Sequence, residues 1–577
     1  MSNHIFLFDH FSQRWLEFMN PVSVFVAHRA ADVGPALREV EAAARRGFWA
    51  AGFVTYEAAP AFDPALLTHH DPSGLPLLWF GIYQSAQTAA APPKVGRGAH
   101  LKWQPSVSVE EYNAGFAQIK NHIAAGQTYQ VNYTFRLGAP FAGNAWELFA
   151  RAVRAQGGGY PVFAETDDWV IGSASPELFF TLDGERLVSK PMKGTAPRGL
   201  RLADDLAQAE WLRNSEKNRA ENVMIVDMVR NDMGRIARLG SVRVPELFEV
   251  EKYRTVWQMT STVACETRAS LSEIFAALFP AASITGAPKA STMRIIRELE
   301  NSPRRIYTGT LGYIAPGFGR ERSAERRRAQ FNVAIRTFLL EKRSGQVEYG
   351  LGGGIVWDSE PRDEMQEAHA KAKILTETPP DFSLLETLLW TPEGGFVLQE
   401  RHLERMRESA AYFDFAFDES QIREKLSALR AETPQRVRLL LDAEGEISLE
   451  RSALNPLPAP YRIRLAENPI PSKNPFLYHK TTYRKPYEAA RLPECDDVLL
   501  WNERGELTES TIANLVVARG GELLTPPVEC GLLPGTARAQ WLAEGRLREA
   551  VIRVEDLAGC DKIFLLNSVR GLWEITL

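Results

Sequence analysis

Two consecutive prolines, Pro379 and Pro380, constrain the organisation of this 577-residue chain more than any other feature. A helical pattern over residues 362–375 must end before them, because proline has no backbone N–H and its fixed φ interrupts a helix. A strand-like segment, FSLLETLLW, follows at residues 382–390 and runs into the turn sequence TPEGG. The sequence therefore predicts two domains and a linker: residues 1–375, 382–577 and 376–381.

Both predicted domains mix helices and strands. In the first, β-branched segments such as FNVAIRTF and GGGIVW alternate with helical stretches, the longest of which covers residues 204–229. In the second, strand-like segments (RVRLLLD, DVLLW, ANLVV, KIFLLN) accompany helical stretches at residues 399–412 and 537–549. The pattern predicts a mixed α/β (α+β) fold class for both domains.

Composition excludes several classes of protein. Lys and Arg number 67 against 72 Asp and Glu, a formal net charge of −5, so the chain lacks the basic excess of a dedicated nucleic-acid-binding protein. None of the four cysteines forms a CxxC pair, which fits a reducing compartment. No apolar run approaches the roughly 20 residues of a membrane span, and the N-terminus lacks a signal-peptide pattern. We therefore expect a cytoplasmic protein without membrane or nucleic-acid partners.

Glutamates recur at helical spacing in two segments of the first domain. Glu221 shares one helical face with apolar side chains, where a carboxylate is costly unless it is paired or binds a cation. Glu364, Glu367 and Lys371 share a face of a second helix. A salt bridge from Glu221 to an arginine, and an exposed Glu367–Lys371 pair, are the plain structural interpretations. If the two helices converge, their carboxylates suit a Mg²⁺ ion, which takes one or two of them.

Three glycine-bearing segments lie before or between these two helices: PMKGTAPRG (191–199), SITGAPK (283–289) and LGGGIV (351–356). Glycine lets backbone amides approach a bound anion closely, although each segment alone is equally an ordinary turn. In order and residue content, these motifs resemble the chorismate-utilising enzymes. The other motifs that carry the resemblance are SPELFF, KNRAENVMIVDMVRND, GYI, FNVAIRTF, GGGIVWDS and EMQEAHAK. The resemblance covers the first domain and implies the fold of that family, with large antiparallel sheets.

Lys193 indicates a branch of this family. A lysine in the sequence P-M-K-G-T resembles component I of aminodeoxychorismate synthase, whereas anthranilate synthases usually carry alanine there. The resemblance implies amination of chorismate at C4, with the lysine attacking C2 first; an amine does so only when it is neutral. Without the resemblance, Lys193 is equally a solvated loop lysine.

The resemblance assigns two further sets of residues. Three positions match the magnesium ligands: Glu221, Glu364 and Glu367. Five match substrate contacts: Thr285, Tyr313, Arg336, Gly353 and Lys371. Among these, Arg336 and Tyr313 match the pair that grips the enolpyruvyl carboxylate, and Arg suits that task through its bidentate fork.

Two further features of the sequence bear on this chemistry. Trp257 and Gln258 stand where one or two histidines are common, so a histidine acid is not available there. None of the four cysteines lies in the GxCxG-like elbow of a glutaminase. Ammonia must therefore come from a separate glutamine amidotransferase subunit or from solution.

The second domain resembles the fold-type IV pyridoxal-phosphate enzymes, a two-subdomain fold. The motifs LLETL, HLERM, HKTTYR, GELTESTIANLVV and LLPGTAR occur in the family's order. Without that resemblance, Arg405 and Lys480 are ordinary surface charges and Glu509 is a turn residue. With it, Lys480 matches the lysine that binds the cofactor, and Glu509 the carboxylate that keeps the pyridine nitrogen protonated. The phosphate contacts are matched by Arg405, Gly535, Thr536 and Ala537, the last three at a helix N-terminus.

Together the two resemblances imply a bifunctional enzyme of 4-aminobenzoate formation for folate. The first domain makes 4-amino-4-deoxychorismate with Mg²⁺, and the second removes pyruvate with pyridoxal phosphate. The lyase assignment rests on the fusion rather than on residues, so a branched-chain or D-amino-acid transaminase is an alternative for the second domain. A non-catalytic first domain that recruits the amidotransferase is another. Fold-type IV enzymes usually dimerise, and the sequence leaves a homodimer through this domain open.

Overall fold

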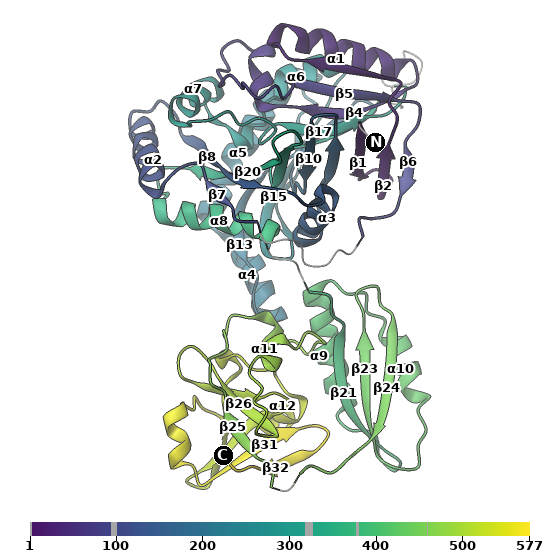
Figure 1. The fold of residues 1–577 in the computed structure, drawn as a ribbon, viewed down its shortest axis with the longest axis vertical. Helices are drawn as coiled ribbons and strands as arrows, with labels where there is room; N and C mark the ends of the chain where they lie inside the picture. Colours follow the sequence, from purple (N-terminus) through teal and green to yellow (C-terminus); the bar gives the residue numbers. More distant parts are fainter. Residues whose placement is uncertain (1–2, 94–100, 318–326, 377–379, 459) are drawn as a thin grey trace. The chain divides into compact units, whose positions relative to one another are not determined.

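The computed structural model describes residues 3–93, 101–317, 327–376, 380–458 and 460–577. These residues divide into two compact units, which are described separately (Figure 1). The first unit comprises Met1–Pro197 and Ala209–Pro379, and the second comprises Arg198–Gln208 and Pro380–Leu577. Part of the predicted linker, residues 377–379, lies outside the described residues. Over the described ranges, no helix combines the length and the apolar character that crossing a bilayer requires.

The first unit contains two large sheets, and every strand pair described in them is antiparallel, as expected for this fold class. The first sheet, in spatial order, is β16 (Gly286–Ala287), β8 (Gln130–Pro140), β20 (Gln346–Ile355), β19 (Thr337–Glu341), β10 (Trp169–Ser173), β9 (Val162–Glu165), β1 (His4–Asp9), β2 (Arg14–Phe18) and β6 (Gln87–Ala89), with β7 (Gln104–Pro105) beside β8.

The second sheet is β13 (Met192–Pro197), β15 (Val256–Glu266), β12 (Arg186–Lys190), β11 (Leu178–Asp183), β18 (Arg328–Asn332), β17 (Thr310–Ile314), β4 (Trp49–Val54), β5 (Leu78–Tyr83) and β3 (Ser23–Ala27), with β14 (Arg243–Lys252) beside β15. Apolar side chains from both sheets and their helices form three buried clusters, which include Phe331, Phe135 and Tyr313 respectively.

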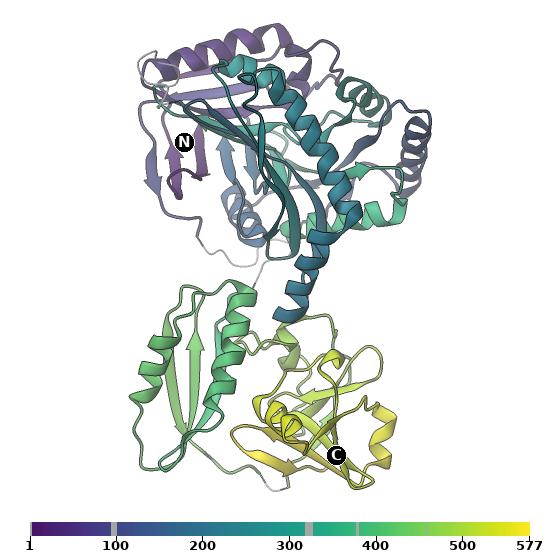
Figure 2. The same cartoon turned by 180° about the vertical axis from the view of Figure 1, so that it is seen from behind.

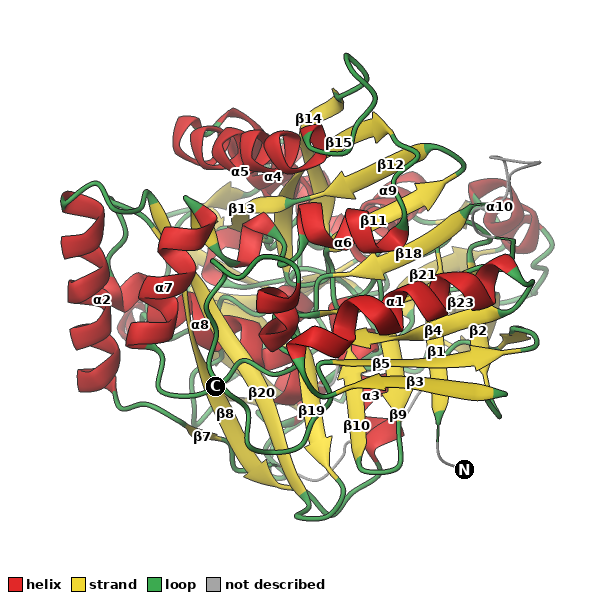
Figure 3. Cartoon of the chain, turned by 90° about the horizontal axis from the view of Figure 1, so that it is seen from above, coloured by secondary structure: helices red, strands yellow, loops and turns green. Residues whose placement is uncertain are grey.

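Helices cover both sheets (Figure 3). The first sheet contacts α2 (Val109–Ala124), α3 (Ala145–Gln156), α7 (Lys289–Leu299) and α8 (Pro361–Thr376). The second contacts α1 (Ala30–Arg45) and α5 (Glu216–Gly234), and α5 is the long helix that lies along β13 and β15 in Figure 2. The helix α6 (Leu271–Leu278) packs against α1 and α5.

The helix predicted before the diproline is confirmed as α8, but the predicted single helix over residues 204–229 is wrong. The chain forms α4 (Leu202–Asn214) and then α5. Ser215 separates them because its extended backbone and its hydroxyl, which accepts a hydrogen bond from the Asn218 amide, begin a new helix.

The second unit has two smaller sheets. One is β22 (Gly395–Phe396), β21 (Leu384–Thr391), β23 (Gln435–Leu441) and β24 (Ile447–Ala453). The other is β25 (Ile463–Leu465), β26 (Asp497–Trp501), β27 (Leu507–Ser510), β28 (Asn514–Arg519), β29 (Glu522–Thr525) and β30 (Arg548–Glu549), with β31 (Lys562–Asn567) joining β28 to β32 (Gly571–Glu574). The helices are α9 (Gln399–Phe413), α10 (Glu419–Ser427), α11 (Lys485–Glu488) and α12 (Thr536–Ala543). This arrangement fits the two-subdomain fold that the sequence predicts.

Candidate active sites

Three consecutive glycines of β20 form one surface of the first candidate site. They pair with Thr134, Tyr133 and Asn132 of β8. A Cβ atom on Gly353 would lie 2.7 Å from Glu364 Oε2, and one on Gly354 would lie 2.6 Å from Lys193 Nζ. The side chains of Glu364 and Lys193, which come from two distant segments, therefore meet the strand where it has no side chains of its own.

Lys193 lies on β13 and forms an ion pair with Glu221 of α5, with 3.5 Å between Nζ and Oε2. Each side chain is only 17% exposed. The partner of Glu221 is thus the predicted nucleophile and not an arginine.

The helix α8 presents its predicted face to the same strand. Lys371 Nζ donates to the Gly352 carbonyl (2.9 Å) and pairs with Glu367 Oε1 (2.9 Å). This pairing lowers the pKa of Glu367. Glu364 instead accepts a hydrogen bond from the Ser359 hydroxyl (2.7 Å), and burial raises the pKa of Glu364. The structure therefore brings Glu364 and Lys371 to the glycine strand, and Glu367 pairs with Lys371.

The three predicted magnesium ligands do not form a preassembled metal site. Glu221, Glu364 and Glu367 each have a different hydrogen-bonding or ionic partner. Within the described residues, no group of three or more His, Cys, Asp or Glu side chains is arranged to hold a metal. Their oxygens are nevertheless the donors that Mg²⁺ prefers, and the ion needs only one or two protein carboxylates. The donor chemistry fits magnesium; in the structure Lys193 and Lys371 pair with two of these carboxylates and the Ser359 hydroxyl contacts the third.

Arg336 belongs to the same region, because its electrostatic neighbours include Tyr349 and Glu367. Its backbone has a positive φ of 51°, and its guanidinium donates to Gln156. Burial lowers the pKa of Arg336. The hydroxyl of Tyr349 donates to the Lys371 carbonyl (3.2 Å), which links this group to α8.

The structure does not pair Tyr313 with Arg336. Tyr313 is 1% exposed and its hydroxyl donates to Asp9 Oδ1 (2.5 Å) within a buried cluster beside Phe18 and Trp49. Strand alternation turns the Tyr313 side chain into this cluster, and its role as a substrate contact stays a prediction.

Tyr307 is a further candidate tyrosine in this region, and none of the sequence motifs singled it out. It is buried, lies close to Tyr349, and its ring fills the space over Gly350 of β20, where a Cβ would lie 2.1 Å from the ring. The contact between Tyr307 and Gly350 depends on the tertiary fold, so spacing along the sequence does not reveal that Tyr307 lies here.

Glu177 is a second functional candidate that sequence reasoning missed, although it stands in the quoted SPELFF motif. It is buried, and its Oε1 accepts a hydrogen bond from the Ser283 hydroxyl (2.5 Å). Burial raises the pKa of Glu177 to about 7, and Lys193 is among the charges that act on it. A carboxyl with this pKa beside an amine can give or take a proton near neutral pH. The signal in the sequence is a glutamate directly before an apolar strand.

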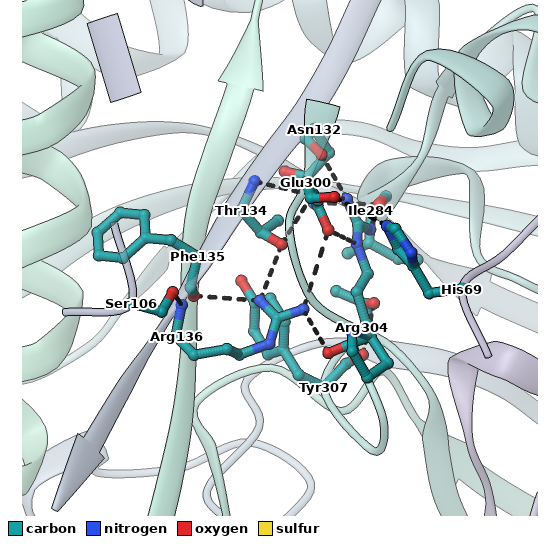
Figure 4. A network of polar contacts seen from close by, with 12 residues as sticks. His69, Ser106, Asn132, Thr134, Phe135, Arg136, Ile284, Glu300, Arg304 and Tyr307 are labelled. Atoms are coloured by element: carbon teal, nitrogen blue, oxygen red, sulfur yellow. Dashed lines mark hydrogen bonds and ion pairs between the residues drawn. The ribbon is translucent and has the colours of Figure 1, made fainter. Parts of the chain in front are cut away.

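A buried ionic network holds the segment that carries Thr285 (Figure 4). Glu300 accepts hydrogen bonds from Arg304 (3.0 and 2.6 Å) and from the amide and hydroxyl of Thr134 (3.0 and 2.8 Å). Arg304 also donates to the Ile284 carbonyl (2.9 Å). Because Ile284 directly precedes Thr285, the network fixes the backbone of a predicted substrate residue.

The hydroxyl of Thr285 is buried and donates to the carbonyls of Ala281 and Ala282 (3.2 Å each). Gln258, which replaces the family histidine, lies next to the Lys193 strand. Its amide donates to the Gly194 carbonyl (3.2 Å) and to the Thr195 hydroxyl (3.0 Å). Gln258 therefore braces the strand and has no group that titrates.

The second candidate site surrounds Lys480. The Leu385 amide donates to the Lys480 carbonyl (2.9 Å), so β21 fixes the lysine's backbone. Burial, together with the nearby cations Arg405 and Arg484, lowers the pKa of Lys480 to about 8. An amine with this pKa is neutral in a substantial fraction of molecules near neutral pH.

Glu509 of β27 is buried and accepts three hydrogen bonds. The donors are the Tyr487 hydroxyl (2.9 Å), the Leu533 amide (3.1 Å) and the Asn514 side chain (3.2 Å). Burial raises the pKa of Glu509 to about 7, and Lys480 is among the charges near it. The three hydrogen bonds fix the Glu509 carboxyl in an orientation in which it can bind a basic nitrogen of a ligand.

Arg405 of α9 is oriented by a buried carboxylate. Its guanidinium donates to both oxygens of Glu386 (2.9 and 2.6 Å) and to the Pro534 carbonyl (3.0 Å). His402 makes a further hydrogen bond to Glu386 (2.6 Å). Although burial alone would raise it, Arg405 and His402 bring the pKa of Glu386 down to about 2. The Pro534 contact places Arg405 next to the turn that begins α12.

The N-terminus of α12 completes this site. Gly535 is the N-cap residue, and a Cβ there would lie 1.9 Å from Asn514 Oδ1. The Thr536 hydroxyl lies 3.2 Å from His402 Nε2. The unpaired amides of a helix N-terminus attract phosphate, and Arg405 beside them adds a positive charge. These groups fit pyridoxal phosphate: Arg405 and the amides at the start of α12 suit its phosphate, and the Glu509 carboxyl suits its ring nitrogen.

Known families match both units. A family model described as chorismate binding enzyme matches residues 4–377, and one described as amino-transferase class IV matches residues 383–577. The chain belongs to the chorismate binding enzyme family and carries a class IV amino-transferase domain after it. Both family resemblances seen in the sequence are thereby confirmed.

Two relatives show how far the sequence similarity extends. The chain is 39% identical over 271 residues to aminodeoxychorismate synthase component 1 of Escherichia coli, covering 47% of this chain and 57% of that protein. It is 38% identical over 312 residues to an anthranilate synthase component 1 of Haloarcula marismortui, covering 52% and 58%. The matches therefore span less than two thirds of these relatives.

Solved structures show the same fold for the first unit. Anthranilate synthase component I from Streptococcus pneumoniae superposes with a TM-score of 0.53 at 24% identity, over 62% of this chain and 91% of that structure. At this identity the likeness shows the fold alone.

Proposed function

We propose that the chain makes 4-aminobenzoate from chorismate in two steps, one in each unit. The observation that carries the first step is Lys193, held against the β20 glycines beside Glu221. The P-M-K-G-T motif and the aminodeoxychorismate synthase relative both favour amination at C4. The domain limits proposed are 1–375 and 382–577.

In the first unit, each of these residues has a separate role in the amination of chorismate. The Lys193 amine adds to C2 while the C4 hydroxyl leaves with a proton, which Glu177 is placed to supply. Ammonia then adds at C4 and the Lys193 amine leaves C2, which restores the enzyme and gives 4-amino-4-deoxychorismate. Arg336, Thr285 and the Gly353 amide bind the carboxylates, and Lys371 holds α8 against the strand.

Mg²⁺ and a partner complete this proposal. Glu221, Glu364 and Glu367 would hold Mg²⁺, which supplies positive charge next to a substrate carboxylate. A glutamine amidotransferase subunit supplies the ammonia. We place the enzyme in the cytoplasm and propose that a homodimer forms through the second unit.

In the second unit, pyridoxal phosphate supplies an electron sink for the bond that breaks. Arg405 and the amides of Gly535, Thr536 and Ala537 hold its phosphate, and Glu509 holds its ring nitrogen. Lys480 takes the proton from C4 of 4-amino-4-deoxychorismate, for which its lowered pKa is suited. The C3–O bond then breaks, the enolpyruvyl group leaves and takes up a proton as pyruvate, and the ring becomes aromatic.

Product identification tests the proposal. Protein supplied with chorismate, ammonium and Mg²⁺ should form 4-amino-4-deoxychorismate without pyridoxal phosphate. With pyridoxal phosphate it should form 4-aminobenzoate and pyruvate in equal amounts. The appearance of 2-aminobenzoate would remove the Lys193 argument.

The amino-transferase description of the second family model supports one alternative. In that case the second unit transfers the amino group of a branched-chain or D-amino acid to 2-oxoglutarate. Formation of glutamate from those substrates, together with stable 4-amino-4-deoxychorismate, would favour the alternative.

A further inference from the structure

A short segment from the first half of the sequence is built into the second unit. Residues Arg198–Gln208 belong to that unit, although about 170 residues separate them along the chain from its main part at Pro380–Leu577. The segment begins directly after β13, the strand that carries Lys193. We call residues 198–208 the inserted segment.

The inserted segment is attached to the C-terminal turn of α9 through Tyr412. The Tyr412 hydroxyl donates to the Gly199 carbonyl (2.7 Å). In the other direction, Arg198 donates to the Tyr412 carbonyl (2.9 Å) and places its guanidinium 4.6 Å from the centre of the Tyr412 ring. Hydrogen bonds in both directions and a cation–π contact make this a specific attachment.

The segment's own conformation is fixed by Asp205. This carboxylate is fully buried and accepts hydrogen bonds from Arg198 Nε (2.7 Å) and from the Gly199 amide (2.8 Å). A Cβ on Gly199 would lie 2.2 Å from the Asp205 amide nitrogen, so only glycine fits this turn. The segment therefore holds its carbonyl groups in set directions.

One of those carbonyls contacts the residue before the cofactor lysine. His479 is 5% exposed, and its Nε2 donates to the Leu200 carbonyl (3.1 Å). A carbonyl only accepts, so Nε2 carries the proton and Nδ1 accepts from the Ser409 hydroxyl (2.9 Å). Burial lowers the pKa of His479 to about 4, which keeps the ring neutral.

The His479 ring is also packed on two sides. It stacks on Tyr412 with 4.3 Å between ring centres and meets the edge of Phe413 at 4.9 Å. The inserted segment thus contacts the ring directly through Leu200 and supports the Tyr412 ring that packs on it. Because His479 precedes Lys480 along the backbone, a change in its position moves Lys480 as well.

We propose that the inserted segment is a positioning element of the second site, in which the Leu200 carbonyl, through His479, fixes the backbone that presents Lys480. The proposal rests on the function proposed for the second unit. It makes part of the chorismate-binding half necessary for the cofactor site. Loss of the Leu200 contact would leave a buried N–H without a partner, which is unfavourable.

Full-length variants test this role, with cofactor binding and the cofactor's spectrum as readouts. His479→Gln retains an N–H near the position of Nε2, whereas His479→Asn and His479→Leu do not. We expect His479→Asn and His479→Leu to weaken pyridoxal-phosphate binding about tenfold, the effect of one lost buried hydrogen bond. The same two variants should shift the pH midpoint of the bound cofactor's visible absorption, and His479→Gln should restore both quantities to within about threefold of wild type.

Two further variants separate positioning from general stability. Tyr412→Phe removes only the hydrogen bond to Gly199 and should weaken cofactor binding by about threefold. Arg201→Ala is the matched control, because Arg201 lies in the same segment but pairs with Asp204 and Glu529 near the surface. It should leave cofactor affinity and spectrum unchanged. Formation of 4-amino-4-deoxychorismate reports that the first unit of each variant is folded, and a urea unfolding transition of the second unit reports that the second unit is folded.

The outcomes are distinct. Wild-type affinity and spectra in His479→Asn and His479→Leu would overturn the positioning role, as would a His479→Gln variant that loses as much as His479→Leu. A wild-type protein that binds no pyridoxal phosphate at all would instead overturn the proposed function of the second unit.

Discussion

Replacement of Glu177 by glutamine tests the proton-transfer role of this carboxyl in the first unit. Burial raises the pKa of Glu177 from 4.5 to about 7. At about 1.4 kcal/mol for each factor of ten in the dissociation constant, that change corresponds to about 3 kcal/mol. The folded protein retains a proton that the unfolded chain releases between pH 4.5 and 7, so this group lowers the free energy of unfolding as the pH rises through that window.

Glutamine resembles the protonated carboxyl and does not titrate. We therefore expect Glu177→Gln to gain about 3 kcal/mol in the free energy of unfolding relative to wild type between pH 4.5 and pH 8. It should also lose amination of chorismate, because an amide cannot deliver the proton to the leaving hydroxyl.

The protein is unfolded with urea at several pH values, and unfolding is monitored by hydrogen–deuterium exchange of peptides from β11 and β12. This experiment gives the free energy of unfolding of the first unit. Glu210→Gln is the matched control, because its side chain is 61% exposed; its effect should not change with pH by more than a few tenths of a kcal/mol. A Glu177→Gln effect that is independent of pH would refute the raised pKa, and full amination activity would refute the proton-transfer role.

Three further predictions concern the other residues. Arg304→Met should lower the free energy of unfolding of the first unit by about 3 kcal/mol in urea titrations, because the buried Glu300 carboxylate would lose its closest cationic partner and keep the more distant Arg136, 3.9 Å away; a loss below about 1 kcal/mol would contradict this. Gly353→Ala should raise the Mg²⁺ concentration needed for half-maximal amination by about tenfold or more, because the methyl group would lie 2.7 Å from Glu364 Oε2. An unchanged Mg²⁺ titration would show that the ion binds elsewhere. Lys480→Ala should let 4-amino-4-deoxychorismate accumulate, whereas undiminished 4-aminobenzoate formation would remove Lys480 from the mechanism.

The sequence predicts those parts of the first site that depend on local periodicity or on a motif. Helical spacing places Glu364, Glu367 and Lys371 on one face of α8; Glu364 and Lys371 meet the glycine strand, and Glu367 pairs with Lys371. The family motif selects Lys193, which lies beside Glu221. Both kinds of evidence require only that short segments keep their expected conformations.

Features that depend on contacts between distant segments were not predicted. The family motif indicates Tyr313, whereas the packing of Tyr307 over Gly350 depends on the tertiary fold and is not visible in the sequence. The role of Glu177 follows from its burial, which the sequence does not give. The inserted segment at residues 198–208 was expected to belong to the first domain, and its hydrogen bonds to Tyr412 and His479 are what place it in the second unit.

Identification of the products formed from chorismate tests the central proposal most directly. Protein is incubated with chorismate, ammonium and Mg²⁺, with and without pyridoxal phosphate, and the products are separated by chromatography and identified by mass. The two-step proposal expects 4-amino-4-deoxychorismate without the cofactor, and equal amounts of 4-aminobenzoate and pyruvate with it. Formation of 2-aminobenzoate, or 4-aminobenzoate formation that does not depend on pyridoxal phosphate, would contradict the proposal.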